Sequence, residues 1–171
     1  MKKRVIVICL VCIAVICCAI YLLKDISKTP SDIVRQYFLN ESASFNLSTV
    51  IEQIDIDSKT TLIFYRTANG GVANAVLERG LLGYKIVDYS GEVALTNDII
   101  PSSCLFSSYG EAKSIMWYVL YDQSITRVIV GGNEASIFSA DNLKIYYTLS
   151  DSPEAQRCEF YNCDELIWLI E

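Results

Sequence analysis

Two aspartates, two positions apart, come closest in this sequence to the spacing of a catalytic or metal-binding pair. Asp55 and Asp57 would lie on one face of a β-strand, where paired carboxylates could hold a calcium ion or act as an acid pair. Ser58 and Lys59 follow them, so the remaining oxygen ligands of a calcium loop are missing. We therefore predict a solvated strand end here, with no metal and no cofactor.

Histidine is absent from the whole sequence. Its absence excludes Ser-His-Asp and Cys-His nucleophile systems and the histidine metal helix, because each of them needs an imidazole. Glycine-rich phosphate-binding motifs are also missing. The neighbours Ser58 and Lys59 would face opposite sides of a strand, so they form no catalytic dyad. We predict no catalytic residues and a protein that is not an enzyme. The alternative is an enzyme that works through carboxylates or a serine without histidine.

Aromatic side chains are the richest binding resource, with 11 tyrosines, six phenylalanines and two tryptophans. Trp117 and Tyr118 are adjacent within one strand pattern, and so are Tyr146 and Tyr147 in another. One member of each pair should face outward if the other faces the core. Exposed tyrosines bind peptides or glycans by stacking and hydrogen bonding, although tyrosine is also an ordinary strand residue. These four residues are the candidate binding surface, and packing in the core is the alternative.

Four of the seven cysteines lie in an apolar N-terminal run, where a thiol behaves as a small hydrophobic side chain. The other three are Cys104, Cys158 and Cys163. Outside the cytoplasm three thiols allow one disulfide. Cys158 and Cys163 are candidates for a bridge across a hairpin, with Asn162 as the turn residue between them. A bridge from Cys104 to either one, or three reduced buried thiols, are the alternatives.

Residues 5–23 form an uncharged apolar run of 19 residues. As a helix this run is roughly 28 Å long, which is close to the hydrocarbon thickness of a bilayer. Lys2, Lys3 and Arg4 precede it and Lys24 follows it, so the positive-inside rule places the N-terminus in the cytoplasm and the rest outside. We predict a retained signal-anchor helix. A cleaved signal peptide and lipid attachment at Cys17 or Cys18 are the alternatives.

Charge is distributed unevenly along the 171 residues. The formal net charge is -6, but all 20 acidic residues lie at or beyond Asp25, where only 10 basic residues remain, which gives -10 for that part. An acidic body repels nucleic acid, so we predict no nucleic-acid partner. The length suits one domain. We predict a cytoplasmic tip and membrane helix over 1–24, a tether over 25–30 and an extracytoplasmic domain over 31–171.

The remainder is typical of an antiparallel β domain preceded by one short helix. Ser31 is a candidate N-cap for a helix over 32–39. Short runs rich in β-branched and aromatic residues then predict strands at 49–56, 60–67, 72–79 and 83–89. Asn69-Gly70, between the second and third of these runs, favours a type I′ turn.

Residues 92–110 interrupt this pattern and predict a loop or a short helix around 102–106. Strand patterns then resume at 114–122, 125–130, 134–139, 143–149 and 157–170. In the last of these, Leu166, Trp168 and Ile170 alternate with Ile167 and Leu169, which suggests burial on both faces. We predict a mainly β fold of eight to ten strands and one or two short helices, as an antiparallel meander that is doubled over or barrel-like.

Two segments carry a resemblance to other proteins. FYRTANGGVANAVLERGLLGYKI and MWYVLYDQSITRVIVGGNEASIF, within residues 60–140, resemble stretches of small membrane-anchored extracytoplasmic proteins of Gram-positive bacteria. The resemblance rests on hydrophobic patterning and glycines, and it implies a location in the cell envelope. We expect a membrane-tethered extracytoplasmic module that binds an envelope protein or a glycan. A structural subunit of a membrane complex is a further alternative.

Overall fold

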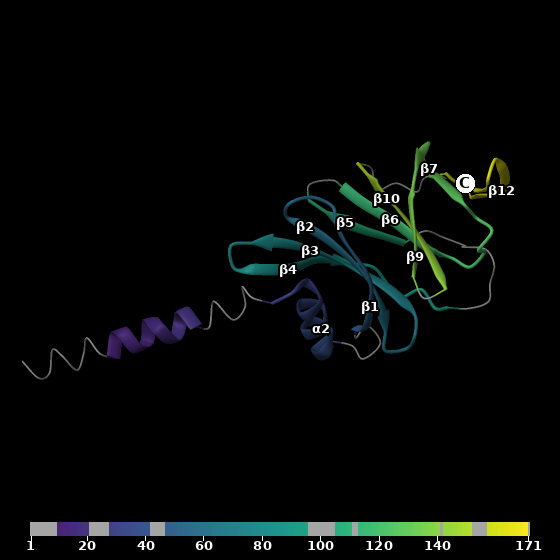
Figure 1. Ribbon diagram of the computed structural model, residues 1–171. Helices are drawn as coiled ribbons and strands as arrows, with labels where there is room; N and C mark the ends of the chain where they lie inside the picture. The colour runs from purple at the N-terminus through teal and green to yellow at the C-terminus, as the bar shows by residue number, and fades with distance from the viewer. Residues whose placement is uncertain are drawn as a thin grey trace, which may run out of the picture.

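The computed structural model describes residues 10–20, 28–41, 47–95, 105–110, 113–140, 142–151 and 157–170 (Figure 1). Helices cover residues 10–20 and Pro30–Glu41, the second of which is α2. The strands of the described residues are β1 (Leu47–Asp55), β2 (Thr60–Thr67), β3 (Val72–Gly80), β4 (Gly83–Tyr89), β5 (Leu105–Tyr109), β6 (Lys113–Leu120), β7 (Arg127–Val130), β8 (Asn133–Glu134), β9 (Ser136–Ala140), β10 (Leu143–Ser150), β11 (Cys158–Asn162) and β12 (Glu165–Ile170).

The strands pair in three antiparallel sheets of four. The first sheet has the order β1-β2-β3-β4, the second β5-β6-β10-β9 and the third β12-β11-β7-β8. The predicted mainly β, antiparallel architecture is confirmed, and the first sheet is a simple meander. The strand pattern over 157–170 forms a hairpin, because β11 pairs with β12.

The three sheets are stacked, and the second sheet is the middle layer. On β6, Trp117 belongs to a buried cluster with Phe64 of the first sheet. Its neighbour Met116 belongs to another cluster with Phe160 of the third sheet. Successive residues of a strand face opposite sides, so β6 contributes to both cores. Figure 1 shows the same order, with the second sheet between the other two.

The outer face of the first sheet is covered by α2. Val34 and Phe38 are buried in a third cluster with Ile63 and Tyr65 of β2. β2 therefore has the helix on one face and the second sheet on the other, and seven of its eight residues are buried. A strand covered on both faces has no solvated side to show in its sequence, which explains the continuous apolar run in β2.

The start of α2 differs from the prediction. Thr29, rather than Ser31, is the N-cap, because its Oγ1 accepts a hydrogen bond from the backbone N–H of Asp32 at 3.2 Å. Asp32 Oδ2 in turn accepts from the backbone N–H of Thr29 at 3.2 Å. These two bonds form a capping box, and Pro30 occupies the first helical position, which needs no N–H donor.

The β2–β3 turn also differs from the predicted type I′ turn. Gly70 has a positive φ of 86°, whereas Asn69 is not among the positive-φ residues. The N–H of Gly70 donates to the carbonyl of Thr67 at 3.0 Å, and the N–H of Thr67 donates to the carbonyl of Gly71 at 3.0 Å. This is the three-residue loop in which a type I turn is followed by a left-handed glycine.

Other element boundaries also differ from the predicted ones. The predicted short helix around 102–106 is wrong at Leu105 and Phe106, which belong to β5, and its other residues lie outside the described ones. The predicted strand over 134–139 is divided, because Ala135 separates β8 from β9 and its N–H donates to Val128 across the turn at 2.9 Å. The described strands thus number twelve, more than the predicted eight to ten, because several of them are short.

Residues 10–20 are helical and lie within the predicted 5–23 span. Within the described residues, no helix combines the length and the apolar character needed to cross a membrane. The remainder of the predicted span lies outside the described residues.

A polar network is buried where the first and second sheets meet. Asn74 of β3 is fully buried, and its Oδ1 accepts hydrogen bonds from Ser90 Oγ at 2.5 Å and from Ser107 Oγ of β5 at 2.9 Å. Trp117 Nε1 donates to Ser90 Oγ at 2.8 Å. Four polar side chains from different segments are therefore connected inside an otherwise apolar interface.

Candidate functional site

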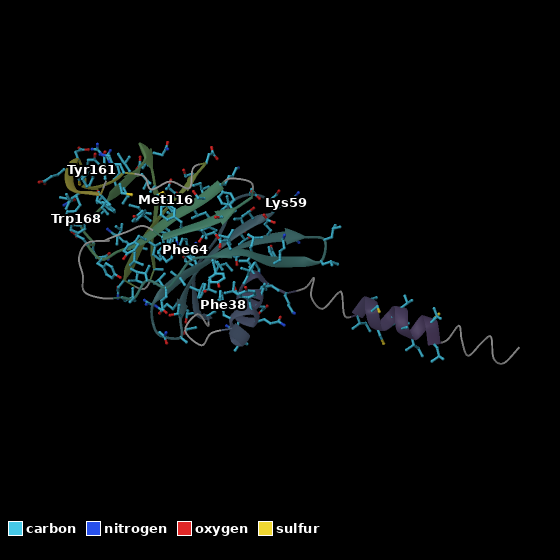
Figure 2. All side chains as sticks on the ribbon, turned by 180° about the vertical axis from the view of Figure 1, so that it is seen from behind. Phe38, Lys59, Phe64, Met116, Tyr161 and Trp168 are labelled. Carbon is cyan, nitrogen blue, oxygen red and sulfur yellow. The ribbon has the colours of Figure 1, made fainter. Side chains whose placement is uncertain are left out.

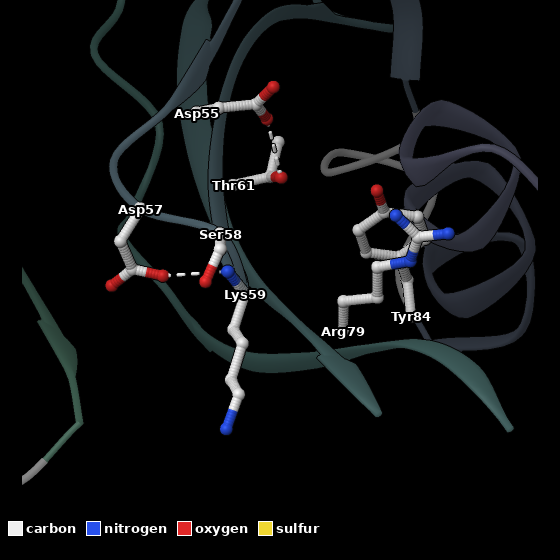
Figure 3. Close-up of a pocket in the computed structure, with 7 residues that line it drawn as sticks. All are labelled: Asp55, Asp57, Ser58, Lys59, Thr61, Arg79 and Tyr84. Atoms are coloured by element: carbon white, nitrogen blue, oxygen red, sulfur yellow. Dashed lines mark hydrogen bonds between the residues drawn. The ribbon is translucent and has the colours of Figure 1, made fainter. Parts of the chain in front are cut away.

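A small polar cavity lies beside the β1–β2 turn and the β3–β4 hairpin (Figure 3). Its volume is about 110 Å³, and its lining residues are Asp55, Asp57, Ser58, Lys59, Thr61, Arg79 and Tyr84. Pockets for metabolite-sized ligands are typically about 300 Å³ or more. This cavity therefore suits a small polar group rather than a large substrate.

Both aspartates of the predicted pair line this cavity, but their carboxylates bond to their own hairpin. Asp55 Oδ1 accepts a hydrogen bond from Thr61 Oγ1 at 2.8 Å. Asp57 Oδ1 accepts from the backbone N–H groups of Lys59 at 2.7 Å and of Thr60 at 2.8 Å. Such bonding is typical of an aspartate that stabilises a turn. The described residues contain no group of three or more acidic, cysteine or histidine side chains placed to hold a metal ion.

The backbone hydrogen bond from Lys59, followed by that from Thr60, holds the pKa of Asp57 below its ordinary value of 3.8. A carboxylate with a lowered folded-state pKa stabilises the fold above the unfolded pKa, and this contribution disappears as the pH falls through the folded pKa. Asp57 is therefore ionised at neutral pH and is a poor proton donor there.

Asp57→Asn is expected to reduce the loss of stability on acidification, because asparagine keeps an acceptor oxygen but has no charge to lose. The measurement is the urea unfolding midpoint at neutral pH and at about pH 3, which lies below the unfolded pKa of an aspartate. Asp164→Asn, at an exposed turn position, is the matched control. An equal acid-induced drop in the wild type and in Asp57→Asn would show that the Asp57 charge contributes nothing.

The cationic side chains at the cavity do not converge on the aspartates. The guanidinium of Arg79 lies over the ring of Tyr84, 5.7 Å from its centroid. Figure 3 shows the Lys59 side chain extending away from both carboxylates. Neither cation is therefore placed to pair with the carboxylates, which are bonded within their own hairpin.

The structure divides the predicted aromatic surface. Trp117 and Tyr146 are fully buried, so the prediction is wrong for these two side chains. Tyr118 and Tyr147 are partly buried, and both pack against the cluster between the first and second sheets. The tyrosines that should face outward are thus partly covered, because the second sheet is the middle layer.

The predicted Cys158–Cys163 disulfide is contradicted. Cys163 is a free, exposed cysteine in the β11–β12 turn, whereas Cys158 is fully buried at the start of β11. Five residues of extended strand span about 16 Å, far beyond the separation of about 4.4 to 6.8 Å that a disulfide allows between Cα atoms. The turn is formed by Cys163 and Asp164 and not at Asn162, so the two thiols do not meet across it. Cys104 lies outside the described residues.

The sequence did not predict an apolar sheet edge at β12. Leu166 is 47% exposed and Leu169 is 41% exposed, which contradicts the predicted burial on both faces. β12 is the end strand of the third sheet, and on its outer side it pairs with no other strand of the described residues. A run of apolar residues in a terminal hairpin was the only signal, and that signal also fits a buried strand.

A β-bulge brings the two exposed leucines onto one face. Leu166 lies opposite Tyr161 and Leu169 lies opposite Glu159, with a register shift between them. Next to them, the guanidinium of Arg127 lies 4.5 Å from the centroid of the Tyr161 ring. We call the surface formed by Leu166, Leu169, Tyr161 and Arg127 the β12 surface. Exposed apolar residues beside a tyrosine and an arginine are typical of protein-binding surfaces.

Comparison with protein-family models, with curated proteins and with solved structures gave no match to this chain. The likeness to membrane-anchored envelope proteins of Gram-positive bacteria therefore stays a prediction.

Proposed function

We propose that this chain is a membrane-tethered extracytoplasmic module that binds a protein segment at the cell envelope through the β12 surface. The uncharged run over residues 5–23, behind three basic residues, supports the tether and its orientation. The exposed apolar edge of β12 is the observation that carries the binding proposal.

Strand addition is the mode of binding that this edge favours. The outer N–H and C=O groups of an end strand are a template for an extended peptide, which gains main-chain hydrogen bonds along the edge. β12 has six residues, which is about 20 Å of strand. Leu166 and Leu169 would then contact apolar side chains of the added segment, and the Arg127–Tyr161 pair would border the contact.

A non-catalytic role is proposed because the polar cavity is small and its carboxylates stabilise a turn. An enzyme that works without histidine would need acid and base groups with different environments that meet in one cleft. Asp55 and Asp57 instead contact separate partners of their own hairpin.

Photo-crosslinking from β12 in cells that make the full chain tests this proposal. A photoreactive amino acid at Leu169 is expected to form protein adducts, whereas the same group at Leu149 of β10 is not. The two positions have matched exposure, 41% and 43%. Leu166→Lys is expected to reduce the adducts from position 169 several-fold, because a charge on an edge strand opposes strand addition.

Location is measured in the same cells. Protease added to intact cells is expected to remove residues after Lys24, and alkaline washing is expected to leave the intact chain in the membrane. Equal adducts at 169 and 149, or no effect of Leu166→Lys, would contradict the binding site. A domain that is protected from external protease would contradict the location and leave the binding result to stand on its own.

A further inference from the structure

The β3–β4 turn presents two leucines to solvent at the tip of a hairpin. Leu81 is 97% exposed and Leu82 is 64% exposed, and they are the two loop residues between the paired glycines Gly80 and Gly83. Gly83 has a positive φ of 100°, which lets the chain reverse within two residues. Neither leucine contributes to the buried clusters, so the fold itself does not explain these side chains.

The residues just behind the tip are basic and aromatic. Arg79 and Lys85 flank the turn, and Tyr84 lies under the Arg79 guanidinium at 5.7 Å. Lys85 also pairs with Glu78 at 3.4 Å, while its side chain stays 68% exposed. This arrangement is typical of a membrane interface, where aliphatic side chains enter the acyl region and tyrosine and basic side chains lie at the headgroups.

Acidic groups also lie at this end of the domain, and an anionic surface would repel them. Asp55 and Asp57 line the neighbouring cavity, and their carboxylates are bonded to Thr61 and to the turn backbone. Lys59 follows both aspartates in the sequence, and its carbonyl accepts from the N–H of Arg79 at 2.7 Å. Counted with Glu78, these acidic side chains are equal in number to the basic side chains Lys59, Arg79 and Lys85, so the exposed leucines carry the proposed contact.

The tip lies at the end of the domain where the chain enters it. Val34 and Ile33, near the start of α2, belong to the same cluster as Tyr84, at the start of β4. Phe38, a turn further along α2, contacts Tyr89 at the end of β4, with ring centroids 5.0 Å apart. α2 thus lies across the outer face of the first sheet, in contact with β1, β2 and β4. Figures 1 and 2, seen from opposite sides, both place the turn and the start of α2 at one end of the molecule.

The tether is short. Five residues, 24–28, separate the end of the apolar run from the N-cap Thr29, and even a fully extended chain of five residues reaches only about 18 Å. A domain held this closely has its entry end near the bilayer. The leucines are at that end, so they are within reach of the membrane surface.

We propose that Leu81 and Leu82 insert into the headgroup region of the bilayer to which the chain is tethered. This inference rests on the proposed tether. Together, the tether and the tip hold the domain at two points, which fixes its orientation. Trp168 of β12 lies at the opposite end of the molecule in Figure 2, so this orientation turns the β12 surface away from the membrane and toward a partner.

Lipid photo-crosslinking of the full chain tests the insertion. The chain carries a photoreactive amino acid at position 82 and is reconstituted into vesicles of phosphatidylcholine and phosphatidylglycerol that contain a clickable phosphatidylcholine. Position 39 is the matched control, because Leu39 of α2 is 63% exposed against 64% for Leu82. Leu39 lies nine residues along α2 from Pro30, about 14 Å from the start of the helix. Several-fold more lipid adduct is expected at 82 than at 39.

Retention after an alkaline wash is read in the same samples, so the two proposals fail separately. A retained chain with equal or no lipid adduct at 82 would overturn the insertion and leave the tether intact. Loss of the chain from the vesicles without adduct would overturn both. Adducts to a second copy of the chain at position 82, in place of lipid, would also overturn the insertion, since the leucines would then cover a protein contact.

Discussion

Phe64→Ala is expected to lower the free energy of unfolding by about 4 kcal/mol. Phe64 belongs to β2 of the first sheet, but its ring packs on three aromatic rings of the second sheet. The ring centroids lie 5.2 Å from Trp117, 5.3 Å from Phe138 and 6.1 Å from Tyr147. Removing a fully buried ring leaves a cavity that these neighbours fill only in part.

Urea denaturation followed by circular dichroism measures this loss in the detergent-solubilised full chain. Phe106→Ala is the matched control, because Phe106 of β5 is 37% exposed, and the change there should cost less than about 1 kcal/mol. Similar losses at Phe64 and Phe106 would contradict the stacking of the first sheet on the second.

Gly71→Ala is expected to lower the free energy of unfolding by about 2 kcal/mol. A Cβ atom at Gly71 would lie 2.7 Å from Cδ of Glu92 and closer still to Cγ and Oε1. The Glu92 side chain must then move, and its Oε1 loses the hydrogen bonds donated by Thr67 Oγ1 at 2.5 Å and by the N–H of Gly71 at 3.1 Å. Bonds to a charged acceptor are stronger than those between neutral groups.

Gly91→Ala is the control, because a Cβ there meets no atom within 4 Å. In a Glu92→Ala background, Gly71→Ala should lower the free energy of unfolding clearly less, since the clash with the Glu92 side chain is then absent. Unfolding in urea gives the free energy of unfolding of the wild type and of each variant. If Gly71→Ala costs the same with and without the Glu92 side chain, the proposed contact is not the cause.

Strand positions were the most predictable part of this fold, because turn residues mark their ends. The predicted strand at 60–67 coincides with β2, and the predicted strand at 83–89 coincides with β4. The stacking order was not predictable, since an apolar run such as that of β2 does not reveal whether a helix or a sheet covers each face. The N-cap was missed because Thr29 and Ser31 both precede a helical pattern, and only the capping box with Asp32 distinguishes them.

At the proposed functional surfaces, the sequence mainly failed to predict which side chains are exposed. Alternation predicted one outward member in the pair Trp117 and Tyr118, but the third sheet covers much of that side as well. The turn at Leu81 and Leu82 was predicted, whereas its almost complete exposure was not, because leucine in a turn is as often folded back onto the domain. The β12 surface depends on a register shift, which a pattern of apolar residues does not encode.

The buried network around Asn74 has a consequence for how the two sheets align. Apolar faces can slide over one another by one residue pair along a strand and still exclude water. Apolar packing alone therefore leaves several alignments of the two sheets nearly equal in energy. Sliding would separate Asn74 from Ser107 and Ser90 from Trp117, and would leave buried donors unsatisfied. The hydrogen bonds among these four side chains therefore favour one alignment of the two sheets over the others that apolar packing would allow.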